Sequence, residues 1–128
     1  MHPEQWLKVM PGGLFCDPGG FFVDPTRGVE RAVISPAHSD HARPGHAHVL
    51  ASAATLALMR ARGIAGAQEQ ALGWGERLRI GEAEIWLQPA GHVLGSAQVV
   101  MEYAGSRVVV SGAYKRQPDR SCEAFVPV

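Results

Sequence analysis

The sequence has few cysteines, no excess of charge of either sign and no long apolar run. Its two cysteines, Cys16 and Cys122, follow no C-x-x-C spacing, so they indicate neither a zinc ribbon nor a redox motif, and we expect free thiols in a reducing cytoplasm. The first eight residues contain Glu4 and Lys8 and lack the apolar stretch of a signal peptide, and no segment approaches membrane-spanning length. We therefore expect a soluble, cytoplasmic protein without membrane contact.

The absence of net charge bears on nucleic-acid binding. Twelve Lys and Arg residues are balanced by twelve Asp and Glu residues. Affinity for nucleic acid that does not depend on base sequence comes mainly from Lys and Arg side chains meeting phosphates. Local basic groups exist at Arg43 and at Lys115 and Arg116, but a solvated surface of mixed charge is the simpler explanation for them. We expect weak or no binding of nucleic acid by this chain alone.

The chain of 128 residues has the length of one domain, and its 15 Gly and 9 Pro indicate many turns. Ser52 is a good N-cap and Gly63 a good stop for a helix of about three turns, whose apolar face needs a sheet to lie on. Apolar runs between glycine turns predict short strands at residues 6–10, 14–16, 21–23, 31–34 and 49–51, and later at 77–80, 83–87, 98–103 and 107–110.

A cluster of potential metal ligands follows the strand predicted at residues 31–34. Residues 35–41 read Ser-Pro-Ala-His-Ser-Asp-His and place His38, Asp40 and His41 within four positions. Imidazole and carboxylate are ligands of divalent cations, and a loop at the end of a strand can turn several of them toward one point. The cluster therefore predicts part of a metal site.

Three histidines follow this cluster in the sequence. His92 stands in a glycine-flanked loop, Gly91 to Ala97, about fifty residues later, and metal sites on such sheets draw ligands from several loops at one edge. A histidine between glycines is weak evidence by itself. His46 and His48 are more simply explained as solvated or as capping a backbone group.

Five segments carry a family resemblance: HPEQWLKV, GGFFVDP, SDHARPGH, GHVLGSAQVV and SGAYKR. They resemble the β-CASP branch of the metallo-β-lactamase fold hydrolases, in particular the bacterial ligase-associated DNA exonucleases, which are also labelled mRNA 3′-end processing factors. The resemblance spans nearly the whole chain. It implies an α/β (α+β) fold, the N-terminal half of an αββα sandwich, with a mostly antiparallel or mixed sheet and one or two helices on one face. On this interpretation residues 1–128 form a single truncated domain, and the β-CASP domain is absent.

The resemblance also implies a pair of zinc ions that activate water and stabilise a phosphodiester displacement. His38 and His92 would bind the first ion and Asp40 and His41 the second, with Asp40 as the catalytic residue. Asp24 would support these ligands through hydrogen bonds. As an alternative, Asp24 only caps a turn before Pro25.

Two expected ligands are replaced in this chain. Position 36 is proline where the family has histidine, and position 113 is alanine where the family has a bridging aspartate. A further histidine would lie beyond Val128, so each ion would keep two protein ligands, whereas catalytic zinc normally has three. We expect zinc binding to be weak or absent.

These losses leave three hypotheses for function. The first is a catalytically impaired relative of the exonucleases, a pseudoenzyme that could serve as an accessory module. The second is a weak zinc-dependent phosphodiesterase whose site is completed by a second subunit, or by His46 or His48. The third is a truncated gene product without a function.

Partners follow from the fold that the resemblance implies. One helix covers one face of the sheet, so the other face, fed by strands 83–87 and 98–110, would be bare. Large apolar patches are rare on soluble monomers, and two-fold homodimers are the commonest oligomers. We therefore expect a homodimer that buries more than about 1,200 Å² sheet to sheet. The family resemblance adds a DNA ligase as a possible DNA-repair partner.

Overall fold

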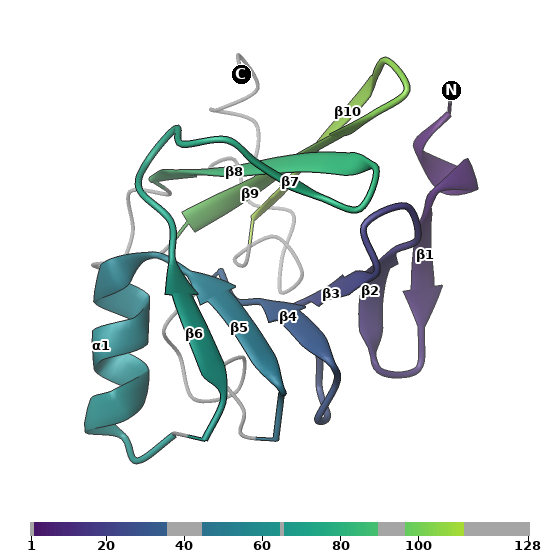
Figure 1. Cartoon of the computed structure of the whole chain (residues 1–128). Coiled ribbons are helices and arrows are strands. Elements are labelled where there is room, and N and C mark those ends of the chain that lie inside the picture. Colours follow the sequence, from purple (N-terminus) through teal and green to yellow (C-terminus); the bar gives the residue numbers. More distant parts are fainter. Residues whose placement is uncertain (1, 36–44, 65, 90–96, 112–128) are drawn as a thin grey trace.

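Two β-sheets packed face to face form the centre of the protein, and one α-helix covers the outer face of the larger sheet (Figure 1). The computed structural model describes residues 2–35, 45–64, 66–89 and 97–111. A short 3-10 helix, Pro3–Gln5, precedes the first strand. The α-helix has nine residues. In the part of the chain that the structure describes, no helix is long and apolar enough to cross a membrane.

The larger sheet has six strands in the order of the sequence. Its first three strands are antiparallel and are joined by tight turns, whereas the third to the sixth are parallel. The strands are β1 (Leu7–Met10), β2 (Gly13–Cys16), β3 (Phe21–Val23), β4 (Arg31–Val33), β5 (His48–Ala51) and β6 (Gln68–Ala71). Because β3 to β6 are parallel, their carboxyl ends all lie along one edge of the sheet, which we call the carboxyl edge. The opposite edge is the amino edge.

Helix α1 (Ala53–Ala61) begins and ends where the sequence predicts. The Ser52 hydroxyl accepts a hydrogen bond from the Thr55 amide at 3.1 Å, and Gly63 takes a positive φ of 82° just after the C-cap. Leu56 and Met59 face the sheet from the helix. They pack against buried residues of the outer face of the sheet: Ala32, Ile34, Val49 and Ala51.

The second sheet is a purely antiparallel meander with the order β10-β9-β8-β7. Its strands are β7 (Leu78–Ile80), β8 (Ala83–Pro89), β9 (Ala97–Tyr103) and β10 (Ser106–Ser111). Gly81 and Gly105 both have positive φ in the turns that join neighbouring strands, as the sequence predicts. A single bridge between Trp74 and Leu87 marks where the chain crosses from the first sheet to the second.

Apolar side chains from both sheets meet in one core. Ile85, Leu87, Val99 and Met101 alternate along β8 and β9 and are fully buried. They face residues of the larger sheet: Phe21, Val23, Val33 and Leu50. A fully buried side chain of this size contributes about 2 kcal/mol to stability by leaving water, so the contact between the sheets is a main source of the fold's stability.

This core corrects one expectation. Strands 83–87 and 98–110 were expected to extend the sheet that α1 covers and to leave its other face bare. They instead form a second sheet, which fills that face. The argument for a homodimer through a bare inner face is therefore lost. The homodimer itself stays a prediction, which light scattering at micromolar concentration decides.

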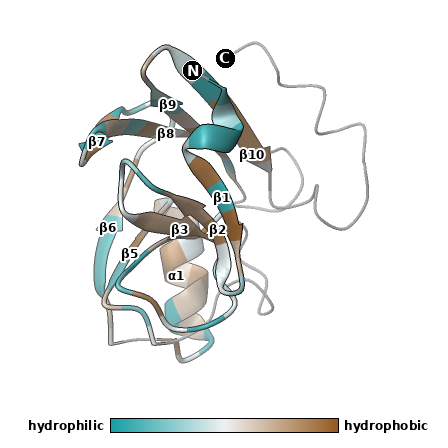
Figure 2. Ribbon diagram, turned by 90° about the vertical axis from the view of Figure 1, so that its right-hand side faces the viewer, coloured by the Kyte–Doolittle hydropathy of each residue, from teal (hydrophilic) through white to brown (hydrophobic). Residues whose placement is uncertain are grey.

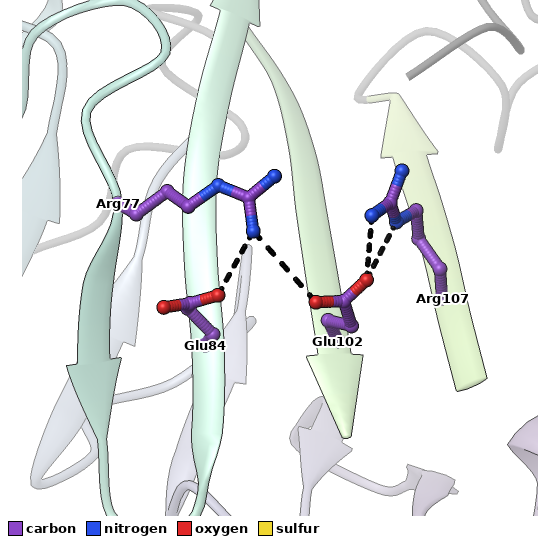
Figure 3. A network of polar contacts seen from close by, with 4 residues as sticks. All are labelled: Arg77, Glu84, Glu102 and Arg107. Carbon is purple, nitrogen blue, oxygen red and sulfur yellow. Dashed lines mark hydrogen bonds and ion pairs between the residues drawn. The ribbon is translucent and has the colours of Figure 1, made fainter. Parts of the chain in front are cut away.

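The outer face of the second sheet carries a network of charged side chains (Figure 3). Arg77 donates a hydrogen bond to Glu84 at 3.0 Å and lies 3.7 Å from Glu102, which also accepts from Arg107 Nε at 2.9 Å. The Arg77 guanidinium stacks over the buried Trp86 ring, 3.9 Å from its centroid. This polar cover differs from the apolar surface expected of a sheet-to-sheet interface.

The predicted strands all occur, with ends shifted by one or two residues. The sequence analysis missed β6, in which three of the four residues (Gln68, Glu69 and Gln70) are polar and which is coloured as hydrophilic in Figure 2. This strand lies at the edge of the sheet, where one neighbour is enough and charged residues discourage unwanted pairing. Trp6 is also not part of β1, because it closes the preceding 3-10 helix.

Candidate functional site

Three polar residues follow three neighbouring parallel strands at the carboxyl edge. Asp24 comes directly after β3, Ser35 comes two residues after β4, and Ser52 comes directly after β5. All three are buried, although each carries a polar side chain. In sheets of this kind, loops that leave the carboxyl ends of parallel strands build the binding sites.

Asp24 and Ser35 are joined by two hydrogen bonds. The Ser35 amide donates to Asp24 Oδ1 at 2.8 Å, and the Ser35 hydroxyl donates to Asp24 Oδ2 at 2.5 Å. Asp24 also donates its amide to the Val33 carbonyl at 2.9 Å and has a positive φ of 46°, which aspartate tolerates better than most residues. The carboxylate of Asp24 therefore fixes the end of β4, where the segment with the predicted ligands begins.

Ser35 also connects the two sheets. Its carbonyl oxygen accepts a hydrogen bond from the amide of Ala97, the first residue of β9, at 3.0 Å. Ala97 pairs with Pro89, whose carbonyl accepts from the Gln98 side chain at 3.0 Å. The segment that begins after Ser35 and the segment that ends before Ala97 are therefore attached at one point on the carboxyl edge.

The predicted metal ligands lie in these two attached segments. Pro36, His38, Asp40 and His41 fall in residues 36–44, and His92 falls in residues 90–96, all outside the described residues, as does Ala113. Among the residues that the structure does describe, no group of three or more His, Cys, Asp or Glu side chains could hold a metal ion. The ligand assignments therefore stay predictions.

His46 and His48 lie at the amino edge, away from this attachment. His48 opens β5 and Ala51 ends it, and strands rise about 3.3 Å per residue, so His48 is roughly 10 Å from the carboxyl edge. Its Nε2 atom lies 3.6 Å from a carboxylate oxygen of Glu30. His46 and His48 therefore do not lie where Asp24, Ser35 and Ala97 meet, and the suggestion that one of them completes a metal site stays a prediction.

His46 serves the packing of the amino edge instead. It is 4% exposed, and its Nδ1 atom accepts a hydrogen bond from the Val29 amide at 3.2 Å. Burial lowers the pKa of His46 below its ordinary value of 6.5, so the imidazole is neutral, as an acceptor must be. Its Nε2 atom has no hydrogen-bond partner in the described part of the chain.

Cys16 is a free, buried thiol, and burial raises its pKa to about 11. A thiol with a raised pKa is a poor nucleophile and a poor metal ligand at neutral pH. The prediction that this cysteine is a free thiol is confirmed, and the residue belongs to the core between the sheets.

Ser35 and Ala97 are the residues of the candidate site that the sequence analysis missed. Neither the serine hydroxyl nor the alanine amide is a recognisable motif, because their roles depend on which strands become neighbours. The one local signal is the position of Ser35, directly before the histidine cluster.

Solved structures with similar folds include a B3 metallo-β-lactamase with an active-site glutamic acid, with a TM-score of 0.57 and 18% identity over 80% of this chain and 57% of that chain. CmlA, a diiron β-hydroxylase from Streptomyces venezuelae, has a TM-score of 0.58 and 16% identity over 95% of this chain and 32% of that one. The chain has the metallo-β-lactamase fold. Its mixed α/β architecture is part of that fold.

Two curated proteins are similar in sequence to this metallo-β-lactamase fold chain. A protein from Opitutus terrae named probable DNA ligase is 38% identical over 121 residues, which are 92% of this chain but 12% of that protein. Subunit 3-I of the cleavage and polyadenylation specificity factor of Arabidopsis thaliana is 35% identical over 49 residues, 38% of this chain and 7% of that protein. The chain thus spans a small part of both relatives. No protein-family model matches it.

Proposed function

We propose that this chain is a catalytically impaired member of the nucleic-acid-processing branch of the metallo-β-lactamase fold, related to metal-dependent DNA and RNA exonucleases. The observation that carries the proposal is the contrast between an intact frame and an incomplete ligand set. The frame consists of four hydrogen bonds among Asp24, Ser35, Ala97 and Val33. Ser35 donates two to Asp24, Asp24 donates one to Val33, and Ala97 donates one to Ser35. Positions 36 and 113, however, carry proline and alanine.

The donor set does not fit a full catalytic zinc pair. Imidazole and carboxylate are suitable zinc ligands, but the first ion would have His38 and His92 and lack a third histidine at position 36. Proline and alanine side chains have no donor atom, so water would have to fill the vacant positions. We therefore assign no catalytic step to a metal in this chain.

The branch within the fold family is supported by the two curated relatives. One is named as a DNA ligase and the other as a subunit of a factor for cleavage and polyadenylation, so both names concern nucleic acid. The balance of twelve basic and twelve acidic residues favours weak nucleic-acid binding by this chain alone. We propose a DNA ligase as its functional partner, which copurification of the two proteins from a coexpressing cell would test.

Metal affinity tests the proposed impairment. Zinc titration of the untagged protein followed by calorimetry should give a Kd no tighter than about micromolar, because a site with two ligands stays largely solvated. The double variant Pro36→His with Ala113→Asp should bind zinc at least about tenfold more tightly, since each change restores a donor atom. Stoichiometric zinc that survives dialysis of the unmodified protein would contradict the proposal.

A matched double variant separates ligation from other effects of substitution. Pro36→Gln with Ala113→Asn introduces side chains of similar size without an imidazole or a carboxylate, and it should leave zinc affinity unchanged. Nuclease activity is measured in parallel on single-stranded DNA and RNA. Activity of the unmodified protein that resists chelators would show that the metal-based interpretation is wrong.

A further inference from the structure

A cavity of about 360 Å³ opens between the larger sheet, at strands β4, β5 and β6, and strand β7 of the second sheet. Its lining includes every residue of β4, all but the last residue of β5 and of β6, and strand β7 across from them. Asp24, Ser35 and Ala97 are not among its lining residues, so the cavity is separate from the candidate site at the carboxyl edge. Its volume lies at the lower end of the range of small-molecule sites.

The strand register builds the polar side of the cavity. Arg31, His48 and Gln68 are direct neighbours across β4, β5 and β6. Side chains alternate along a strand, and Val33 and Leu50, two residues further along, belong to the core between the sheets. Arg31, His48 and Gln68 therefore form one row on the inner face of the sheet, at the mouth of the cavity.

Apolar side chains form the rest of the wall. Val33 and Leu50 lie one row deeper on the same face, and Leu78 and Ile80 of β7 are partly buried against the same core. A ligand in the cavity would thus meet apolar surface inside and polar groups at the mouth. This arrangement suits an amphipathic small molecule rather than a hydrated ion.

The charged residues around the cavity determine which sign of charge a ligand should carry. Glu69 is engaged by Arg60 of α1, whose Nε donates to it at 3.0 Å, and Glu30 lies 3.6 Å from His48. Arg31 is exposed and has no ion pair or side-chain hydrogen bond to any residue that the structure describes. Arg79 also belongs to the lining, but it alternates along β7 with Leu78 and Ile80, which face the core, so its side chain lies on the opposite face of that strand. The inner side of the cavity therefore offers one uncompensated positive charge, on a planar guanidinium that matches the two oxygens of a carboxylate.

We propose that this cavity binds a small organic monocarboxylate, with its carboxylate on Arg31 and its apolar body against Leu50 and Leu78. A single free guanidinium favours a monoanion over a phosphate dianion, which would need a second cation. The amides of Gln68 and Gln70 supply further hydrogen-bond donors at the mouth.

The test uses the whole chain and four probes: benzoate, acetate, benzyl alcohol and inorganic phosphate. Amide shifts in nuclear magnetic resonance spectra report binding at Ala32, Val49 and Leu78. Benzoate should bind with a Kd of about millimolar, as expected for a ligand of this size. Acetate lacks the apolar body, benzyl alcohol lacks the charge and phosphate lacks both the body and the matching charge, so each should bind more weakly.

Variants at the mouth locate the carboxylate. Arg31→Gln should weaken benzoate binding about tenfold, because it removes charge-assisted hydrogen bonds. Arg31→Lys keeps the charge but loses the planar fork, so its affinity should fall in between. Lys8→Gln makes the same change of charge on the distant β1 strand and should leave the Kd unchanged. Equal binding of benzyl alcohol and benzoate, or equal effects of Arg31→Gln and Lys8→Gln, would overturn the proposal.

Discussion

The two edges of the parallel strands β3 to β6 hold their polar groups in different ways. At the carboxyl edge, Asp24 and Ser35 are buried and share two hydrogen bonds, and Ser35 extends the network to the second sheet through Ala97. At the amino edge, His46 uses one ring nitrogen and His48 forms a long, half-exposed contact with Glu30. The hydrogen bonds of the carboxyl edge reach the second sheet through Ala97, whereas these two contacts of the amino edge join only segments that flank the strands of the larger sheet.

Among variants that compare the two edges, Asp24→Ala is expected to lower stability the most. The change leaves the buried amide and hydroxyl of Ser35 without these acceptors and places alanine at a positive φ, so stability should fall by about 3 kcal/mol. Urea denaturation measures the loss. Asp24→Asn is the matched control, because asparagine tolerates this φ and keeps one acceptor oxygen. If Asp24→Ala lost less stability than a variant at the amino edge, the carboxyl edge would not be the more important of the two for stability.

His46→Leu should have the next largest effect, about 2 kcal/mol, because the buried Val29 amide loses its acceptor. His46→Gln offers an oxygen in place of Nδ1 and should recover part of that loss. The same denaturation assay ranks both variants against Asp24→Ala. Equal stability of the two variants would mean that the hydrogen bond to Val29 contributes nothing.

The pH dependence of stability gives a second measure of His46. Its pKa in the folded protein is lowered by burial below 6.5, while the unfolded chain keeps the ordinary value. The unfolded state therefore takes up a proton first, and the contribution of neutral His46 is fully present above about pH 6.5 and is lost as pH falls toward the folded pKa. The stability difference between wild type and His46→Gln should shrink over that interval; a constant difference would argue against the lowered pKa.

Ser52→Ala should cost about 1 kcal/mol, since the hydroxyl caps α1 at the carboxyl edge by accepting from the Thr55 amide. Thermal unfolding followed by circular dichroism measures the change. Ser52→Thr keeps a capping hydroxyl and should stay close to wild type. If both variants behaved alike, the cap would not be what holds the start of the helix.

The smallest effect is expected for His48→Gln at the amino edge. The contact with Glu30 is 3.6 Å long and largely exposed, so the change in stability should stay below about 0.5 kcal/mol. A larger loss would show that the amino edge carries more than local packing.

Much of the fold could be predicted from local sequence, because alternation and glycine turns act over a few residues. Strands such as β8 and β9 and the ends of α1 follow from such signals. The division into two sheets could not be predicted this way, because the apolar residues of a strand such as β3 or β8 do not indicate which sheet the strand joins. The polar strand β6 lacked that pattern altogether.

For the candidate site, the sequence indicated Asp24 but not its partner. Both interpretations of Asp24 involved hydrogen bonds, and the structure shows these going to Ser35, eleven residues away. Similarly, nothing in the local sequence shows that His46 lies at the edge of the sheet opposite Asp24 and Ser35. That distinction depends on strand direction, which is a property of the whole sheet.

The hydrogen bond from Ala97 to Ser35 has a consequence for the order of folding. Its partners are 62 residues apart (97 − 35) and belong to different sheets, so it cannot form before the sheets dock. Contacts of such separation are late and slow in folding, because a long loop must close first. Hydrogen exchange at the Ala97 amide should therefore be as slow as exchange of the core strands, and its protection should arise in the last step of refolding.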